Sequence, residues 1–478
     1  MTFDVEKNGY STGDKTSFAW SSARQRWPVI ITTAIDDVYR TVHAETDPEV
    51  VKEGKQILES LANLKYQVQH DRALTPIPDD GYPDVALYNE ELAKLSPATW
   101  LNVPWLYSEC HLYRQVSSPS DDFSSTLLLR TLVPSSQTHH GLTHKHILHP
   151  NPALEDVRPL PPPKISTFRS SRAAVLELAS RYRTLVGEIR AGGTISDDAE
   201  RLMFTEMLEV CLWGNATDLS LLTTLTYDDI QKLQGSEARK AAENNILAND
   251  TAAAFAVLRR ARDEGKAERR VDIVLDNSGF ELYVDLILAG YLLSSGLATH
   301  VVLHPKSIPC PFTRPLRRRD PPEQDPAPLA DADAENLAFL FEQWSGFHAE
   351  GQVILRPNRF WTHGGSFWRL PTEAPELLED LKASELVIFK GDLNYRKLTA
   401  DVSCLGPHNS FVTALGPLGP GAGVNILSLR TCKADVVVGL EPGVDEELRA
   451  KEGGGGDSGE RRWAWNGKWA VISFSPRN

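Results

Sequence analysis

An aspartate and an asparagine follow a short apolar run in the middle of the chain. The run spans residues 271–275 and is typical of a buried strand, and Asp276 and Asn277 come directly after it. Ser278 and Glu281 have the spacing of a capping box, which predicts that a helix begins here. Carboxylate and amide oxygens suit a hard divalent cation, and a helix N-terminus suits an anion. This stretch therefore predicts a site for a metal ion together with a phosphate group.

Two further apolar runs end in polar clusters that contain both acids and bases. Residues 385–389 are followed by Asp392 and Arg396, and residues 425–429 are followed by Lys433. Lys433 and Arg396 could neutralise phosphate oxygens as negative charge develops during phosphoryl transfer. The spacing leaves open whether water or a carboxylate such as Asp392 attacks phosphorus. Ordinary ion pairing along a sheet edge is the competing interpretation.

These clusters can cooperate only if a sheet brings the strand ends together. In an open α/β sheet, ligands bind in the crevice at the carboxyl ends of the strands. The apolar runs predict strands at 271–275, 300–303, 385–389, 425–429, 436–438 and 469–474. Helical periodicity predicts helices within 18–68, 100–116, 170–186, 199–213 and 338–344, and within 237–263 with an interruption near 249–251.

The predicted organisation has three parts. A flexible tail covers residues 1–16, a mainly helical region covers 17–205 with a disordered insertion near 117–165, and an α/β metal- and phosphate-binding domain covers 206–478 with a loop insertion near 310–334. The first insertion contains HHGLTHKHILH, in which the histidines suggest metal ligands but the proline-rich surroundings favour a loop. In the helix at 100–116, Glu109 and Arg114 are interpreted either as a satisfied polar pair or as a contribution to the site.

Composition argues against several classes of protein. The formal net charge of −14 is unsuited to a nucleic-acid surface, and the five scattered cysteines have neither disulfide-framework nor zinc spacing. Neither a signal-peptide core nor an apolar run of about 18 residues is present, so a cytoplasmic or nuclear protein without membrane contact is expected. The sequence also lacks the GxxxxGK[ST], strand-following GxGxxG and GxSxG motifs of P-loop, dinucleotide-binding and α/β-hydrolase proteins.

Three long motifs carry a resemblance to a known family. They are LDNSGFELYVDLILAGYLL at 275–293, LVIFKGDLNYRKL at 386–398 and LRTCKADVVVGL at 429–440. In these stretches the chain resembles the metal-dependent damage-control phosphatases of the domain-of-unknown-function 89 group. The most similar branch is the eukaryotic one with an Arg-Thr-x-Lys motif, which is also named for a proposed acidic-residue methyltransferase activity.

The resemblance implies a three-layer α/β/α sandwich with an additional helical N-terminal region. It implies hydrolysis of sugar phosphates and related phosphometabolites, such as fructose 1-phosphate and fructose 6-phosphate, dependent on Mn²⁺, Ni²⁺, Co²⁺ or Mg²⁺. Asp276 and Asn277 would be metal ligands that also touch the substrate, and Glu281 would line the substrate or methyl-donor pocket. The phosphorylated substrate would be gripped by Asp392, Leu393, Asn394, Tyr395, Arg396 and Lys433.

One departure from the family pattern concerns the metal. The family continues Lys-x-Ile-Pro with a segment that ends in a third metal-binding aspartate, whereas here Arg314 stands at that position. A catalytically inactive sugar-phosphate-binding protein is therefore one alternative. A second alternative is an S-adenosylmethionine-dependent protein-glutamate methyltransferase, although the sequence has no glycine-rich loop typical of that cofactor. The physiological substrate and the oligomeric state do not follow from the sequence.

Overall fold

One sheet of seven strands organises the computed structural model, which describes residues 9–44, 46–117, 171–191, 196–214, 245–306 and 329–478. The strand order is β1–β7–β6–β5–β2–β3–β4. Neighbouring strands are parallel except β6 and β7, which are antiparallel. The strands are β1 (Ile246–Asn249), β2 (Arg270–Val274), β3 (His300–His304), β4 (Val353–Leu355), β5 (Leu386–Lys390), β6 (Ile426–Thr431) and β7 (Ala470–Ser475).

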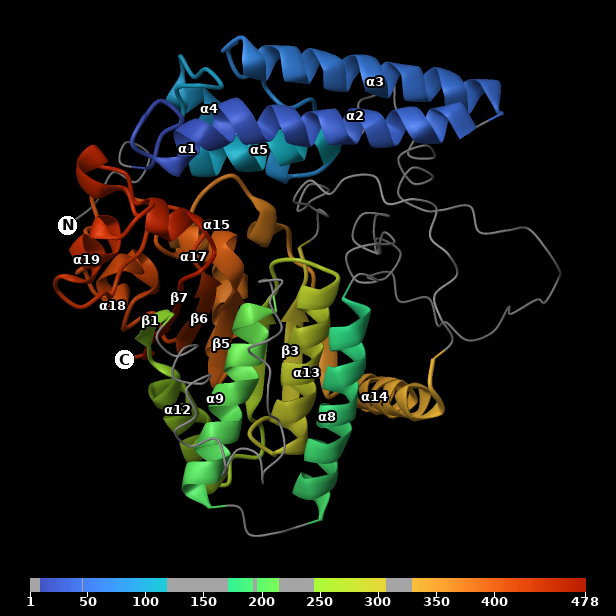
Figure 1. Ribbon diagram of the computed structural model, residues 1–478, viewed down its shortest axis with the longest axis vertical. Helices are drawn as coiled ribbons and strands as arrows, with labels where there is room; N and C mark the ends of the chain where they lie inside the picture. Colours follow the sequence, from blue (N-terminus) through green and yellow to red (C-terminus); the bar gives the residue numbers. More distant parts are fainter. Residues whose placement is uncertain (1–8, 45, 118–170, 192–195, 215–244, 307–328) are drawn as a thin grey trace.

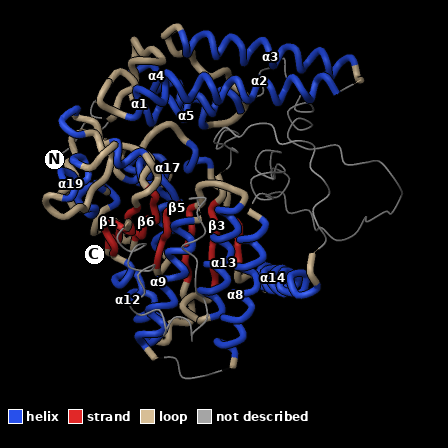
Figure 2. The backbone as a smooth tube through the Cα atoms, in the orientation of Figure 1, coloured by secondary structure: helices blue, strands red, loops and turns tan. Residues whose placement is uncertain are grey.

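Helices cover both faces of the sheet, so the α/β portion has three layers (Figures 1 and 2). Because side chains alternate along a strand, Ile388 packs into one core and its neighbours Val387 and Phe389 pack into the other. The first core contains α8 (Arg172–Arg190), α9 (Asp197–Trp213), α12 (Thr251–Asp263), α13 (Phe280–Ser294) and part of α14 (Asp331–Ala349). The second contains α16 (Pro375–Lys382), α17 (Gly391–Leu398), α18 (Phe411–Ala414) and α19 (Val444–Ala450).

A separate layer of N-terminal helices lies across one end of the α/β portion (Figure 1). It has its own core, centred on the fully buried rings of Trp27, Trp100 and Trp105. None of the helices in the described ranges combines the length and apolar character needed to cross a bilayer. The helices of this layer are α1 (Phe18–Ser21), a π-helical turn (Ser22–Arg26), α2 (Trp27–Ala44), α3 (Pro48–Gln69), α4 (Asp84–Leu95) and α5 (Trp105–Ser117).

The predicted fold class is confirmed: a mostly parallel sheet lies between helical layers, with a helical N-terminal region. Three details of the strand prediction are wrong. Residues 436–438 form a buried loop whose apolar side chains pack into the second core without pairing in the sheet. The strands β1 and β4 were not predicted, because both are short, lie at the sheet edges and include partly exposed residues. The residues of β1 fall within the region 237–263, for which a helix was predicted, so that prediction is wrong for this stretch.

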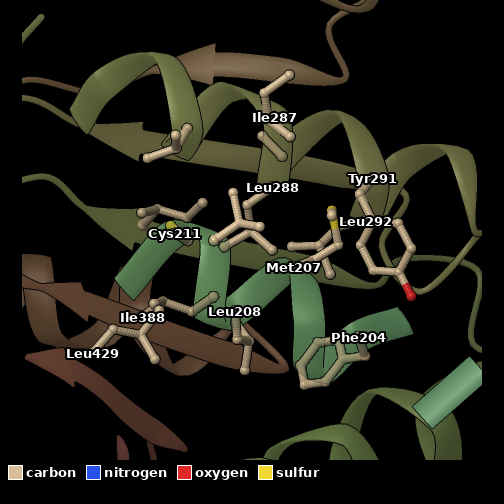
Figure 3. Packing of buried hydrophobic residues seen from close by; sticks show 14 of the residues in the cluster. Phe204, Met207, Leu208, Cys211, Ile287, Leu288, Tyr291, Leu292, Ile388 and Leu429 are labelled. Atoms are coloured by element: carbon tan, nitrogen blue, oxygen red, sulfur yellow. The ribbon is translucent and has the colours of Figure 1, made fainter. Parts of the chain in front are cut away.

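The packing of two segments differs from the predicted organisation. Helices α8 and α9 belong to the layer on the sheet, where α9 lies beside α13 and packs against β5 and β6 (Figure 3). Residues 9–16 of the expected tail are also packed, since Gly9 and Ser11 form bridges with Val402 and Pro104 and Tyr10 is buried. The predicted boundary near residue 206 stays a prediction.

The strand order creates a switch point between β5 and β2. The chain runs from β2 to β3 on one side, whereas β5 and β6 extend the sheet on the other side of β2. Crossovers that lead away in opposite directions leave a crevice at the carboxyl ends of the two central strands, where ligands bind in open α/β sheets. The residues after Val274 and Lys390 therefore occupy the expected ligand-binding position.

Candidate functional site

Asp276 and Asn277 lie just beyond the carboxyl end of β2. The Lys306 ammonium, at the end of β3, is 2.5 Å from Asp276 Oδ1. Asn277 donates through Nδ2 to Glu281 Oε2 at 2.9 Å and to Asp276 Oδ2 at 3.4 Å. Its side chain is thereby oriented with the amide nitrogen towards the two carboxylates.

Helix α13 begins at Phe280 as predicted, but the predicted capping box is wrong. The N-cap residue is Gly279, at φ 75°, and the Ser278 hydroxyl has no hydrogen-bond partner in the described part of the chain. Glu281 instead accepts the hydrogen bond from Asn277. Burial, reinforced by the nearby Asp276 carboxylate, raises the pKa of Glu281 to about 7. Glu281 therefore supports the β2 tip and does not cap the helix.

A glycine allows the tip of β5 to lie against the tip of β2. Gly391 has φ 83°, and a Cβ atom there would lie 2.0 Å from Asp276 Oδ2. Asn394 joins the same two tips, because its Nδ2 is 3.2 Å from the Leu275 carbonyl and 2.8 Å from the Lys390 carbonyl. Asp276 and the start of α17 are therefore held in direct contact.

Asp392 connects the β5 tip to the β6 tip. Its Oδ1 accepts hydrogen bonds from Arg430 Nε at 2.8 Å and from the Lys433 backbone amide at 3.0 Å. Burial alone would raise the pKa of the Asp392 carboxyl, but Arg430, Arg396 and the Lys433 amide hold that pKa below its ordinary value. Asp392 is thus an anion fixed by two neighbouring segments.

Lys433 retains an uncommitted charge. Its side chain is partly exposed, and its ammonium has no ion pair or hydrogen bond with any residue that the structure describes. The side chain runs past Gly467, where an added Cβ would lie 3.8 Å from Lys433 Cε. Among the predicted basic residues, Lys433 is the one whose charge remains available to an anionic ligand.

The remaining residues of the segment 392–396 have structural contacts. Leu393 packs against the N-terminal helical core, and the Tyr395 hydroxyl accepts a hydrogen bond from the Val438 amide at 3.1 Å. Arg396 is buried over the Trp105 ring and bound to two carboxylates, Glu109 and Asp401. The structure therefore brings Asp276, Asn277, Glu281, Asp392, Asn394 and Lys433 together at one edge, and it turns Leu393, Tyr395 and Arg396 towards internal partners. The predicted contact of these three residues with substrate stays a prediction.

The polar residues of α5 have separate partners. Glu109 Oε2 is 2.6 Å from Arg396 Nη1 across the boundary between α5 and α17. Arg114 instead binds Asp80 and Asp84, each at 2.7 Å. The proposed Glu109–Arg114 pair is thus replaced by three ion pairs, of which the one between Glu109 and Arg396 reaches the site-bearing segment.

The donors at the β2 tip suit a hard divalent cation. Because Asn277 directs its amide nitrogen to the carboxylates, its Oδ1 remains without a hydrogen bond from the described residues. Mg²⁺ and Mn²⁺ sites commonly use one or two carboxylates, water and substrate phosphate, a pattern that Asp276 and the Asn277 oxygen fit. No group of three or more His, Cys, Asp or Glu with metal-binding geometry is found in the described ranges. Arg314 and the histidine-rich segment lie outside those ranges.

Two residues of the site were not singled out from the sequence. Lys306 follows β3, and its position after the strand beside β2 is the signal that could have placed it near Asp276. Gly391 stands between a buried strand and a helix, where a positive φ is common, but its contact with Asp276 involves a residue 115 positions away in the chain.

Comparison with known proteins gives one consistent family. The signature described as "Damage-control phosphatase ARMT1-like domain" matches residues 22–448. Proteins named "Damage-control phosphatase ARMT1" align over nearly the whole chain. That of Xenopus tropicalis is 32% identical over 474 residues, covering 96% of each chain. That of Danio rerio is 30% identical over 473 residues, covering 96% of this chain and 95% of the relative, and that of Homo sapiens is 27% identical over 493 residues, covering 96% and 97%.

Proposed function

The chain belongs to the damage-control phosphatase ARMT1-like domain family, and on that premise we propose that it is a metal-dependent phosphomonoester hydrolase. The proposed substrates are small phosphorylated metabolites of the fructose 1-phosphate and fructose 6-phosphate type. The proposed cofactor is a divalent cation, Mn²⁺ or Ni²⁺ in the first place, with Mg²⁺ and Co²⁺ as further candidates.

The observation that carries the proposal is the contact between the tips of β2 and β5. Asp276 lies against Gly391, and Asp392, the next residue, is hydrogen-bonded to the backbone of Lys433. Acidic oxygens and an uncommitted ammonium are thereby gathered at the switch point of the sheet. A phosphate monoester needs both kinds of group, since its charge requires cations and the bound cation requires oxygen ligands.

The roles of the residues follow from these positions. Asp276 and Asn277 would hold the cation, which when bound supplies Lewis-acid polarisation of a phosphoryl oxygen. Lys433 would neutralise the remaining phosphate charge and strengthen this contact as negative charge develops on the leaving oxygen. Asp392, held by Arg430 Nε and the Lys433 amide, would position the β6 tip for that contact. Lys306 and Arg430 thus balance the charges of Asp276 and Asp392 before substrate binds, and the charge of Lys433 is left for the phosphate.

The proposal is tested by measuring phosphate release from fructose 1-phosphate and fructose 6-phosphate. The purified protein is treated with a chelator and then supplied in turn with Mn²⁺, Ni²⁺, Co²⁺ and Mg²⁺. We expect activity to disappear with the chelator and to return with at least one metal.

The variant Asp276→Ala tests whether Asp276 is required for the metal-dependent release of phosphate. We expect this variant to lose activity by on the order of 100-fold or more, because it removes a charged oxygen from the reacting centre. Asp263→Ala, at the exposed end of α12, is the control and should keep wild-type turnover. Unchanged turnover in Asp276→Ala would refute the assignment. If the protein binds sugar phosphate but does not hydrolyse it with any of the four metals, the result would support an inactive sugar-phosphate-binding protein.

A further inference from the structure

A buried lysine lies directly beneath the proposed site and does not face it. Lys390 is the last residue of β5, and its side chain is 2% exposed. Its ammonium is 3.0 Å from Asp285 Oδ1 on α13, 2.6 Å from the Cys211 carbonyl and 2.9 Å from Cys211 Sγ on α9. An ammonium has three N–H donors, so these three partners occupy its hydrogen-bonding capacity.

The surroundings of Lys390 favour a fixed positive charge. Burial lowers the pKa of the ammonium, but the combined effect of Asp285, Cys211 and Glu281 outweighs burial and holds that pKa well above its ordinary value. Cys211 lies in the last turn of α9, where the helix dipole favours a cation. Cys211 lies in the apolar interface between α9 and α13 (Figure 3), and the side chains of Lys390 and Asp285 are almost completely buried, which shields the pair from water.

The same residue adjoins the backbone that carries the site. Lys390 is followed by Gly391, which touches Asp276, and then by Asp392, which binds the backbone of Lys433. A shift of the β5 tip relative to α13 would therefore change the separation of Asp276 and Asp392. The carbonyl of Lys390 accepts from Asn394, whose amide also binds the end of β2, so backbone and side chain hold the same turn.

We infer that Lys390 is a positioning residue of the proposed phosphatase site: its ammonium ties the β5 tip to α9 and α13 and thereby fixes Asp276 against Gly391 and Asp392. The inference rests on the proposed function for its kinetic readout. Its second readout, the binding of Mn²⁺ alone, does not require turnover.

The test compares Lys390→Met with a matched control at the other end of the sheet. Arg270, the first residue of β2, is also buried and bound to two carboxylates, Asp272 and Asp380, each at 2.7 Å. Arg270→Met should therefore lower the melting temperature to a comparable extent. We expect Lys390→Met to lower kcat and Mn²⁺ affinity by about 10- to 100-fold, the range seen for supports of metal ligands, while Arg270→Met changes both by less than about twofold.

A double variant separates positioning from compensation of charge. Lys390→Met combined with Asp285→Asn removes the uncompensated buried carboxylate, so the melting temperature should recover towards that of the wild type. Because the link from β5 to α9 is still missing, kcat and Mn²⁺ affinity should stay low. This variant also carries the test if Lys390→Met does not fold.

Two results would overturn the inference. One is wild-type kcat and Mn²⁺ affinity in Lys390→Met, and the other is recovery of both together with the melting temperature in the double variant. A wild-type protein that hydrolyses no phosphometabolite with any metal would refute the proposed function. In that case the Mn²⁺ titrations of the wild type and the variants would still decide the role of Lys390.

Discussion

Replacing Gly391 by alanine should disrupt the site by a predictable amount. Gly391 has φ 83°, and the added Cβ would lie 2.0 Å from Asp276 Oδ2 and 2.6 Å from Asp276 Cγ. Real Cβ atoms essentially never approach a heavy atom closer than 3.0 Å, so the Asp276 carboxylate or the β5 tip must move by about 1 Å. A misplacement of about 1 Å at a reacting centre can reduce the rate by about 100-fold.

The effect on stability has two parts, which a second glycine separates. A non-glycine residue in the left-handed region costs about 1–2 kcal/mol, and overpacking costs a further 1–3 kcal/mol or so. Gly296, just after α13, has φ 70° with no atom within 4 Å of an added Cβ, so it provides the backbone part alone. We expect Gly296→Ala to lose about 1–2 kcal/mol of unfolding free energy and to keep its activity.

The measurement is kcat/KM for metal-dependent phosphate release, with urea unfolding of both variants. Gly391→Ala should lose about 100-fold in kcat/KM and more unfolding free energy than Gly296→Ala. Equal kcat/KM in the wild type and Gly391→Ala would show that the position of Asp276 against the β5 tip has no part in the reaction.

Two further predictions concern the contact of the N-terminal helices with the site. Glu109→Gln should lower the unfolding free energy by about 2 kcal/mol, since the buried Arg396 loses one charged partner and keeps Asp401. The control is Glu177→Gln at an exposed ion pair, which should change the unfolding free energy by less than about 1 kcal/mol. Equal losses of the two variants in urea unfolding would contradict the reasoning. Asp435 accepts hydrogen bonds from Ser17 and Trp465, and burial raises its pKa to about 6. The folded state therefore holds this proton more tightly than the unfolded state, so its contribution to stability is complete below pH 4 or so and declines by about 3 kcal/mol as the pH rises through 6. When the unfolding free energy is measured from pH 4 to pH 7, Asp435→Asn should not show this decline in stability. An identical pH dependence in the wild type and Asp435→Asn would argue against a role of the Asp435 proton.

The strands that carry the site could be predicted because the information is local. A buried parallel strand needs a run of apolar residues, and the runs at 271–275, 300–303, 385–389 and 425–429 correspond to β2, β3, β5 and β6. The polar residues after each run are equally visible in the sequence. Because parallel strands place their carboxyl ends at one edge of the sheet, these residues could be predicted to lie there. Residues 436–438 are equally apolar but serve as a buried loop, because an apolar run specifies burial and not hydrogen bonding.

The sequence alone determined the fold class and the residue types at the strand tips, since both depend on patterns within a few residues. The tertiary structure decided which tips touch and which charges remain available. Arg396 and Lys433 are both basic residues after a strand, yet only the fold commits Arg396 to Glu109, 287 positions away. The contact of Asp276 with Gly391 likewise depends on the order of strands across the sheet. Such long-range contacts arise from the path of the whole chain, and no local pattern encodes them.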